Sequence, residues 1–257
     1  MNRNELVSII LLSCNKAHLL DSTIKSILVQ TYLYWELIIV DDASSDGSIQ
    51  RIMDLRDGKH CFKISQCVFT RGQTANRNSA LRDAKGKWIA FIDNGDIWEP
   101  TKLEKQVGFM EDYGFAFTYS LYKLIDKKKG RNLQISGPET ISEKDMMKCC
   151  WMGYLTVMYD RERIGFLQIE GLRDSNDYAL WLLAVQKADC QLYPECLASQ
   201  LSENSIAYRL LTSEKFLCRY ESYRKIYKKN PLSSLYLTFR NLAYTMWKWW
   251  KYAKCVE

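Results

Sequence analysis

The sequence lacks the features of several large classes of protein. It contains no apolar run long enough to cross a bilayer, which argues against a membrane-spanning helix. Its first residues do not have the basic and then apolar layout of a signal peptide, so we expect a cytoplasmic chain. It has only two histidines, His18 and His60, and neither has neighbours at metal-ligand spacing. No serine-nucleophile, phosphate-cradling or zinc motif is present, and there is no internal repeat.

The nine cysteines also follow no pattern. They show no paired metal-ligand spacing, and an odd number cannot all pair internally. We interpret them as reduced thiols, mostly in the core, which agrees with a cytoplasmic compartment. The 257 residues suffice for a sizeable core, and no segment resembles a long linker. We therefore expect one α/β domain with a C-terminal appendage.

Two apolar runs that end in carboxylates are the most informative feature of the chain. The run over 37–40 ends in Asp41 and Asp42, and the run over 88–92 ends in Asp93-Asn94-Gly95-Asp96. A third apolar run, over 7–13, precedes apolar residues at helical spacing, so the chain begins with a βαβ unit. In an open, mostly parallel sheet flanked by helices, both acidic tips lie at the carboxyl edge and can converge on one ligand.

The other predicted elements follow from the same criteria. We expect a helix over 49–55, a strand over 61–69, a loop over 71–74 and a short helix through 78–84, with Gly86 at its C-cap. A helix opens at Glu99-Pro100, and strands are expected over 115–123 and 153–159.

Several motifs in a fixed order resemble a known family. They are Val7-Ser8-Ile9-Ile10, the Asn15-Lys16-Ala17 turn, Ser26 to Tyr32, Glu36 to Ser48, Ala75-Asn76-Arg77-Asn78, Ala84 to Pro100, and Asn176 to Trp181. Together they resemble glycosyltransferase family 2, which has the GT-A fold. The resemblance implies a Rossmann-like GT-A domain over 1–210, with the nucleotide-sugar half at about 1–100 and the acceptor half at about 101–210. A basic, aromatic helical extension would follow over 211–257.

The resemblance assigns a set of residues to the nucleotide sugar. They are Ser13, Asn15, Asp41, Asp42, Arg77, Asp93 and Asn94. Asp42 has the position of the family's base-binding carboxylate, and a carboxylate can accept the N3–H of uracil, a contact that cytosine cannot make. The alternative is that Asp41 and Asp42 cap the following helix, although Ser45 and Asp46 suit that role better. Arg77 presents a planar fork of donors that suits base or phosphate oxygens, or else it is a surface arginine.

The metal site is where the sequence departs from the family pattern. The family has Asp-X-Asp, whose second aspartate binds Mg²⁺ or Mn²⁺, but here Gly95 occupies that position. Three interpretations follow: Asp96 replaces the ligand, or Asp93 holds a weakly bound ion with water, or basic side chains replace the metal. The first predicts a Mg²⁺ or Mn²⁺ site with Asp93 and Asp96 as ligands.

Asp177 is the candidate catalytic base. A polar turn over 173–177 leads into an apolar helical run, and the family has an acidic pair here whose second member is the base. Asn176 replaces the first member, and Asp177 keeps the second. A carboxylate can take the proton of an acceptor hydroxyl that attacks C1 opposite the leaving group, which inverts the anomeric configuration. The alternative is that Asp177 caps the helix.

The function implied by the resemblance is transfer of one sugar. The Gln-X-X-Arg-Trp motif of processive members is missing, and Tyr208-Arg209 resembles the closing segment of members that add sugars to cell-surface glycans. We expect an inverting, nonprocessive hexosyltransferase that uses a UDP-sugar and a lipid-linked saccharide acceptor in capsule or lipopolysaccharide synthesis. The alternative, suggested by Gly95 and Asn176, is a catalytically inactive nucleotide-binding or scaffold protein of the same fold. Nucleic acid is not an expected partner, because the strand-tip carboxylates would repel phosphate.

The tail from Tyr220 to Glu257 mixes basic and aromatic residues. Leu235, Phe239, Leu242 and Met246, with Trp249 or Trp250, fall at helical spacing. Two interpretations are open: this apolar face packs on the protein, or it lies in the surface of the inner membrane.

Overall fold

The structure, a computed structural model, describes residues 4–126, 130–169, 171–172, 177–202 and 212–256. Its first half alternates strands with helices, as expected for an α/β domain. The elements are β1 (Val7–Ser13), α1 (Ala17–Leu28), β2 (Trp35–Asp41), α2 (Ser48–Asp54), β3 (Cys61–Gln66), α3 (Gln73–Asp83), β4 (Trp88–Asp93), β5 (Asp96–Trp98) and α4 (Lys102–Tyr113).

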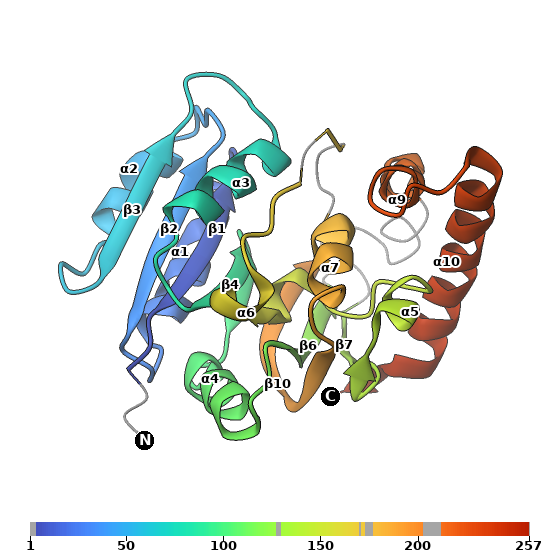
Figure 1. The fold of residues 1–257 in the computed structure, drawn as a ribbon. Helices are drawn as coiled ribbons and strands as arrows, with labels where there is room; N and C mark the ends of the chain where they lie inside the picture. Colours follow the sequence, from blue (N-terminus) through green and yellow to red (C-terminus); the bar gives the residue numbers. More distant parts are fainter. Residues whose placement is uncertain (1–3, 127–129, 170, 173–176, 203–211, 257) are drawn as a thin grey trace.

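The second half extends the same sheet and adds helices at one end of the molecule (Figure 1). Its elements are β6 (Phe117–Asp126), β7 (Arg131–Ile135), β8 (Thr140–Ile141), α5 (Glu143–Met146), the 3₁₀ turn η1 (Tyr154–Thr156), β9 (Met158–Asp160), α6 (Arg161–Ile164), α7 (Asp177–Val185), β10 (Cys190–Ser202), α9 (Ser213–Lys225), α10 (Pro231–Tyr252) and β11 (Ala253–Val256). The expected helical tail is present as α9 and α10, but β11 then pairs with β7. The end of the chain is therefore part of the sheet.

The central strands run parallel and end at one edge. The strand order is β11-β7-β6-β9-β4-β1-β2-β3. Strands β3, β2, β1 and β4 run parallel to one another, and β9 pairs antiparallel with β4. Ser13 of β1 lies opposite Asp41 of β2, and Leu12 lies opposite Asp93 of β4. This register confirms that both acidic tips lie at the same edge of the sheet.

Both faces of these strands are buried, which explains their continuous apolar runs. Side chains of alternate residues point to opposite faces, so Ile10 and Phe91 join one core cluster while Ile9 and Ile92 join the other. Helix α1 covers the second face through residues one helical turn apart, Leu20, Ile24 and Ile27. None of the helices that the structure describes combines the length and the hydropathy that a bilayer-spanning segment needs.

Three local predictions are corrected by the structure. Helix α3 begins at Gln73 and includes part of the expected 71–74 loop. Gly86 is not a C-cap, because α3 ends at Asp83, with Ala84 as its cap residue. A Cβ at Gly86 would lie 2.6 Å from the backbone of Leu6 and Ser8, so close packing against β1 requires glycine there. The strand expected over 153–159 is instead η1 followed by the short β9.

Candidate active site

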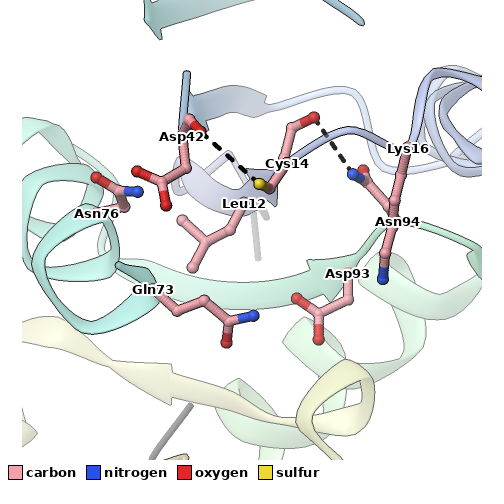
Figure 2. Close-up of a pocket in the computed structure, with 9 residues that line it drawn as sticks. Leu12, Cys14, Lys16, Asp42, Gln73, Asn76, Asp93 and Asn94 are labelled. Atoms are coloured by element: carbon pink, nitrogen blue, oxygen red, sulfur yellow. Dashed lines mark hydrogen bonds between the residues drawn. The ribbon is translucent and has the colours of Figure 1, made fainter. Parts of the chain in front are cut away.

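A pocket lies at the carboxyl ends of β1, β2 and β4, and residues of α3 also line it. Its lining residues are Leu12, Ser13, Cys14, Lys16, Asp42, Gln73, Asn76, Asp93 and Asn94. Figure 2 shows Asp42 and Asn76 on one side of this pocket, and Lys16, Asn94 and Asp93 on the other. Four of the predicted nucleotide-sugar residues, Ser13, Asp42, Asp93 and Asn94, are thus brought together. A hydrogen bond of 3.3 Å from Asn94 Nδ2 to Ser13 Oγ connects two of the strand tips.

The two carboxylates that end β2 have different surroundings. Asp41 is fully buried, and its oxygens accept hydrogen bonds from the backbone N–H and the hydroxyl of Ser44 at 2.9 and 2.6 Å. Asp42 lines the pocket, and its oxygens accept from the backbone N–H groups of Arg71 and Gly72 at 2.8 and 3.3 Å. An ionised carboxylate has about four lone-pair sites, so Asp42 retains the capacity to accept from a ligand. The side chain of Asp41 is occupied in holding the turn.

Asn15 joins the loops that follow β1 and β2, and it is not among the pocket-lining residues. Its backbone N–H donates to Ser44 Oγ at 2.8 Å, and its Oδ1 accepts from the Ser45 N–H at 2.9 Å. Asp46 holds the first turns of α1 and α2, because its carboxylate accepts from the N–H groups of Ala17 and Ser48 at 2.8 and 3.1 Å. Asp46 thus supports the start of α2 from the position before the N-cap residue, which is Gly47.

Arg77 lies inside the protein, not at its surface. Only 2% of the residue is exposed, and its Nη2 donates to Asp177 Oδ1 at 2.7 Å while its Nε donates to the Tyr154 hydroxyl at 3.2 Å. Burial alone would lower the pKa of the guanidinium, but Tyr154 and Asp177 raise it, so the group is charged. The Asp177 side chain is 36% exposed. Arg77 therefore holds one oxygen of a carboxylate that solvent, or a second substrate, can reach.

Asp93 lies between the pocket and this ion pair. Burial and the neighbouring Asp177 carboxylate raise its pKa, and Arg77 and Lys16 oppose that shift. The like charges of these two carboxylates repel each other, so a cation beside Asp93 would be favourable. Asn176, next to Asp177 in sequence, and Tyr208-Arg209 lie outside the described residues.

The expected metal pair is not assembled at the pocket. Asp93 lines it, whereas Asp96 is 3% exposed within β5, where its backbone oxygen accepts from Thr23 Oγ1 at 2.9 Å. In the part of the chain that the structure describes, no group of three or more His, Cys, Asp and Glu is placed to hold a metal. Mg²⁺ commonly binds through one or two carboxylates, with water and substrate phosphates as its other ligands. The Asp93 carboxylate lines the pocket and could therefore bind such an ion. Asp96 is not among the lining residues, so it is not placed to be a second ligand there.

Sequence reasoning missed several residues of the site. Lys16, Gln73 and Asn76 line the pocket, and Tyr154 binds Arg77. Lys16 and Asn76 belong to motifs on which the family resemblance rests, so the sequence could have identified them as site residues. Gln73 was expected in a loop, and Tyr154 has no local signal, because its partner is 77 residues away.

Comparisons with a family model and with individual proteins point to the same family. Residues 8–161, more than half of the chain, match the family model described as Glycosyl transferase family 2. The chain is 36% identical over 213 residues to the putative teichuronic acid biosynthesis glycosyltransferase TuaG of Bacillus subtilis, covering 80% of this chain and 83% of TuaG. It is 32% identical over 238 residues to WfgD of Escherichia coli, covering 90% of each chain. WfgD is named as a UDP-Glc:α-D-GlcNAc-diphosphoundecaprenol β-1,3-glucosyltransferase.

Solved structures share the fold at low sequence identity. TarS 1–349 of S. aureus in complex with UDP-GlcNAc superposes with a TM-score of 0.70 at 17% identity, covering 95% of this chain and 72% of that one. The chain spans 43% of a longer TarS structure. The mannosyltransferase PcManGT of Pyrobaculum calidifontis, solved with GDP-Man and Mn²⁺, gives a TM-score of 0.65 at 17% identity, covering 92% and 69%. These likenesses confirm the GT-A fold.

We expect Arg77→Ala to destabilise the protein by about 1–3 kcal/mol, because it leaves a void beside Tyr154 and removes the charge that faces Asp177. Arg82→Ala, on the exposed side of the same helix, is the matched control and should change stability by less than about 0.5 kcal/mol. Urea unfolding measures both. Equal effects of the two substitutions would show that the buried contacts of Arg77 contribute nothing.

Proposed function

The chain belongs to glycosyl transferase family 2 and is a glycosyltransferase, and we propose that it transfers one sugar from a UDP-sugar to a lipid-linked saccharide in the synthesis of a bacterial surface polysaccharide. The observation that carries the proposal is that Asp42 and Asp93 line one pocket and that the Arg77–Asp177 pair is close enough to Asp93 to shift its pKa. The names of TuaG and WfgD support the same class of reaction. UDP-glucose with a GlcNAc-diphospholipid acceptor is the first pair to test, since WfgD is named for that reaction.

We assign the nucleobase to Asp42 and the diphosphate to the opposite side of the pocket. The Asp42 carboxylate can accept the N3–H of uracil, and the backbone N–H groups of Arg71 and Gly72 hold it in position. Lys16, the residue before α1, places an ammonium group beside Asp93 and Asn94 in the same pocket (Figure 2). A lysine ammonium is a compact charge that suits a phosphate oxygen. Arg77 faces Asp177, and we therefore give it a positioning role.

We assign the general base to Asp177. The acceptor oxygen forms a bond to C1 of the sugar while the bond from C1 to the diphosphate oxygen breaks, and the acceptor proton moves to the carboxylate. Attack from the face opposite the leaving group inverts the anomeric centre. Arg77 occupies Oδ1 of Asp177, which orients the carboxylate while part of the side chain is open to a substrate.

We propose that Asp93 holds a Mg²⁺ or Mn²⁺ ion together with the donor phosphates. The ion, when bound, would neutralise charge on the departing diphosphate. PcManGT, which shares the fold, is solved with Mn²⁺. Asp93 is the one carboxylate of the Asp93 to Asp96 turn that lines the pocket, so the ligand role is proposed for it alone.

Asp177→Asn should lower kcat for sugar transfer by about 10²- to 10⁴-fold, because the amide keeps the shape of the side chain but cannot accept the proton. UDP binding should stay within about two-fold of wild type. A transfer assay and calorimetry with UDP measure the two effects, and Asp83→Asn, an exposed carboxylate on α3, is the control. Undiminished transfer by Asp177→Asn would exclude this base. UDP binding by wild type without turnover of any donor would favour the inactive scaffold.

Chelation of divalent ions should abolish transfer, and added Mn²⁺ or Mg²⁺ should restore it. Asp93→Asn should raise the Mn²⁺ concentration needed for half-maximal activity about ten-fold or more, since it removes the protein's charged ligand. Asp96→Asn and Asn94→Ala are the comparison variants, and both should leave that concentration nearly unchanged. Full activity in the presence of chelator would contradict the metal proposal. Lys16 would then have to neutralise the charge of the diphosphate without a metal ion.

A further inference from the structure

Helix α10 presents its polar face to the protein. Its buried residues, apart from Leu237, are Ser234, Thr238, Asn241, Thr245 and Lys248. These polar groups have partners: Asn241 Nδ2 donates to the hydroxyls of Tyr178 and Tyr223 at 3.1 and 3.2 Å, and Lys248 Nζ donates to the Cys150 carbonyl at 2.9 Å. A helix that buried its apolar face would show the reverse arrangement. The packing interpretation of the apolar tail residues is therefore wrong for most of them.

The apolar residues of α10 form an exposed stripe. We call Leu232, Leu235, Tyr236, Phe239, Met246, Trp247 and Trp250 the α10 stripe. Leu232 is 81% exposed, Phe239 57% and Trp250 82%. The spacing from Leu232 to Phe239, Met246 and Trp250 returns to the same side of the helix at each step. Figure 1 shows α10 at the end of the molecule opposite β3, where one side of the helix is free of other elements.

Positive charge lies at both ends of this stripe. Between Glu221 and Glu257 the sequence has eight basic residues and no acidic one. Lys228 and Lys229 precede the helix and are exposed, and Lys251 near its end lies 4.8 Å from the ring centroid of Trp247. Both ends of the stripe thus carry cations that can face an anionic surface.

A basic groove lies beside the stripe, between α5 and the start of α10. Lys144, Lys148, Lys229 and Arg240 line it, together with Tyr236 of the stripe. Lys148 is paired with Asp145 at 2.8 Å, and Arg240 Nη2 donates to the Met147 carbonyl at 3.3 Å. The Nε of Arg240 is buried and has no hydrogen-bond partner among the described residues. Such a cluster of donors suits the phosphate of a lipid headgroup.

We propose that the α10 stripe and this basic groove dock the enzyme on an anionic lipid bilayer. Trp and Tyr favour the headgroup region, and each nearby Lys or Arg adds about 1 kcal/mol of attraction to anionic lipid. A second copy of the chain is a poorer occupant, because it would bring two basic faces together. Nucleic acid would satisfy the charges but not the apolar stripe. A bilayer with anionic headgroups satisfies both.

The docking face is connected to the catalytic helix. Asn241 of α10 binds the hydroxyl of Tyr178, which follows Asp177 at the start of α7, and Tyr178 also contacts Tyr223 of α9 at 2.9 Å. A lipid-linked acceptor presents its sugar close to the bilayer, so a docked enzyme would meet that sugar with a fixed orientation. The orientation toward a lipid-linked acceptor rests on the proposed function, whereas docking on the bilayer does not.

Co-sedimentation with vesicles tests the proposal. The probes are phosphatidylcholine vesicles with and without about one third phosphatidylglycerol, at low and high salt. The stripe variant Leu232→Ser/Phe239→Ser/Trp250→Ser and the groove variant Lys144→Gln/Lys229→Gln change exposed or groove-lining positions. Their controls change exposed residues elsewhere: Val29→Ser/Leu33→Ser for the stripe and Lys59→Gln/Lys85→Gln for the groove. Truncation is a poorer test, because it would remove β11 from the sheet.

We expect wild type to bind the anionic vesicles more tightly than the neutral ones, and less tightly at high salt. The stripe and groove variants should each lose about ten-fold or more in partitioning at low salt, and the controls should match wild type. Equal binding by wild type and both variants, or no binding by wild type at low salt, would overturn the proposal. Self-association without lipid that the stripe variant abolishes would identify a second copy as the occupant. Vesicle binding without sugar transfer would contradict the proposed function and leave docking intact.

Discussion

The buried guanidinium of Arg77 is the contact on which the arrangement of the site depends. It joins α3, which lines the pocket at the strand ends, to Tyr154 of η1 and to Asp177, a residue 100 positions away at the start of α7. Burying a charge costs several kcal/mol unless partners offset it, so the arginine stabilises the fold only when η1 and α7 are in place. A guanidinium suits this role because it has five donors and stays charged when desolvated. The orientation of the proposed base is thus a consequence of how the two halves of the molecule pack.

The acidic residues at the strand ends divide between structure and ligand binding. At β2, Asp41 holds the turn through Ser44 while Asp42 reaches the pocket, and after β4, Asp93 reaches the pocket while Asp96 stays within β5. Three carboxylates then remain around the site, and Lys16 and Arg77 oppose them. Carboxylates repel an anionic diphosphate, so the site can bind one only if cations offset that repulsion. Lys16 supplies one such cation, and the divalent ion proposed for Asp93 would supply the other.

The sequence predicted the central sheet well, because parallel strands buried on both faces produce long apolar runs whose ends can be located. It also predicted that Asp42 and Asp93 share one edge, which the register confirms. It could not predict that Arg77 is buried against Tyr154 and Asp177, because both partners are distant in sequence. Nor could it predict which face α10 buries. Asn241 and Thr245 are buried in place of Phe239 and Met246, because distant residues offer them hydrogen bonds. These partners are Tyr178 and Tyr223 for Asn241, and Cys149 for Thr245. The role of Gly86 likewise depends on the approach of β1.

The central claim is that the shared strand edge recognises a uridine nucleotide through Asp42. Calorimetric titration of wild type and Asp42→Asn with UDP and CDP tests it most directly. We expect wild type to bind UDP about ten-fold or more tightly than CDP, because only uracil donates an N3–H to the carboxylate. Asp42→Asn should narrow that preference, since an amide can donate to N3 of cytosine as well as accept from N3–H of uracil. Equal affinity of wild type for UDP and CDP, or an unchanged preference in Asp42→Asn, would contradict the account.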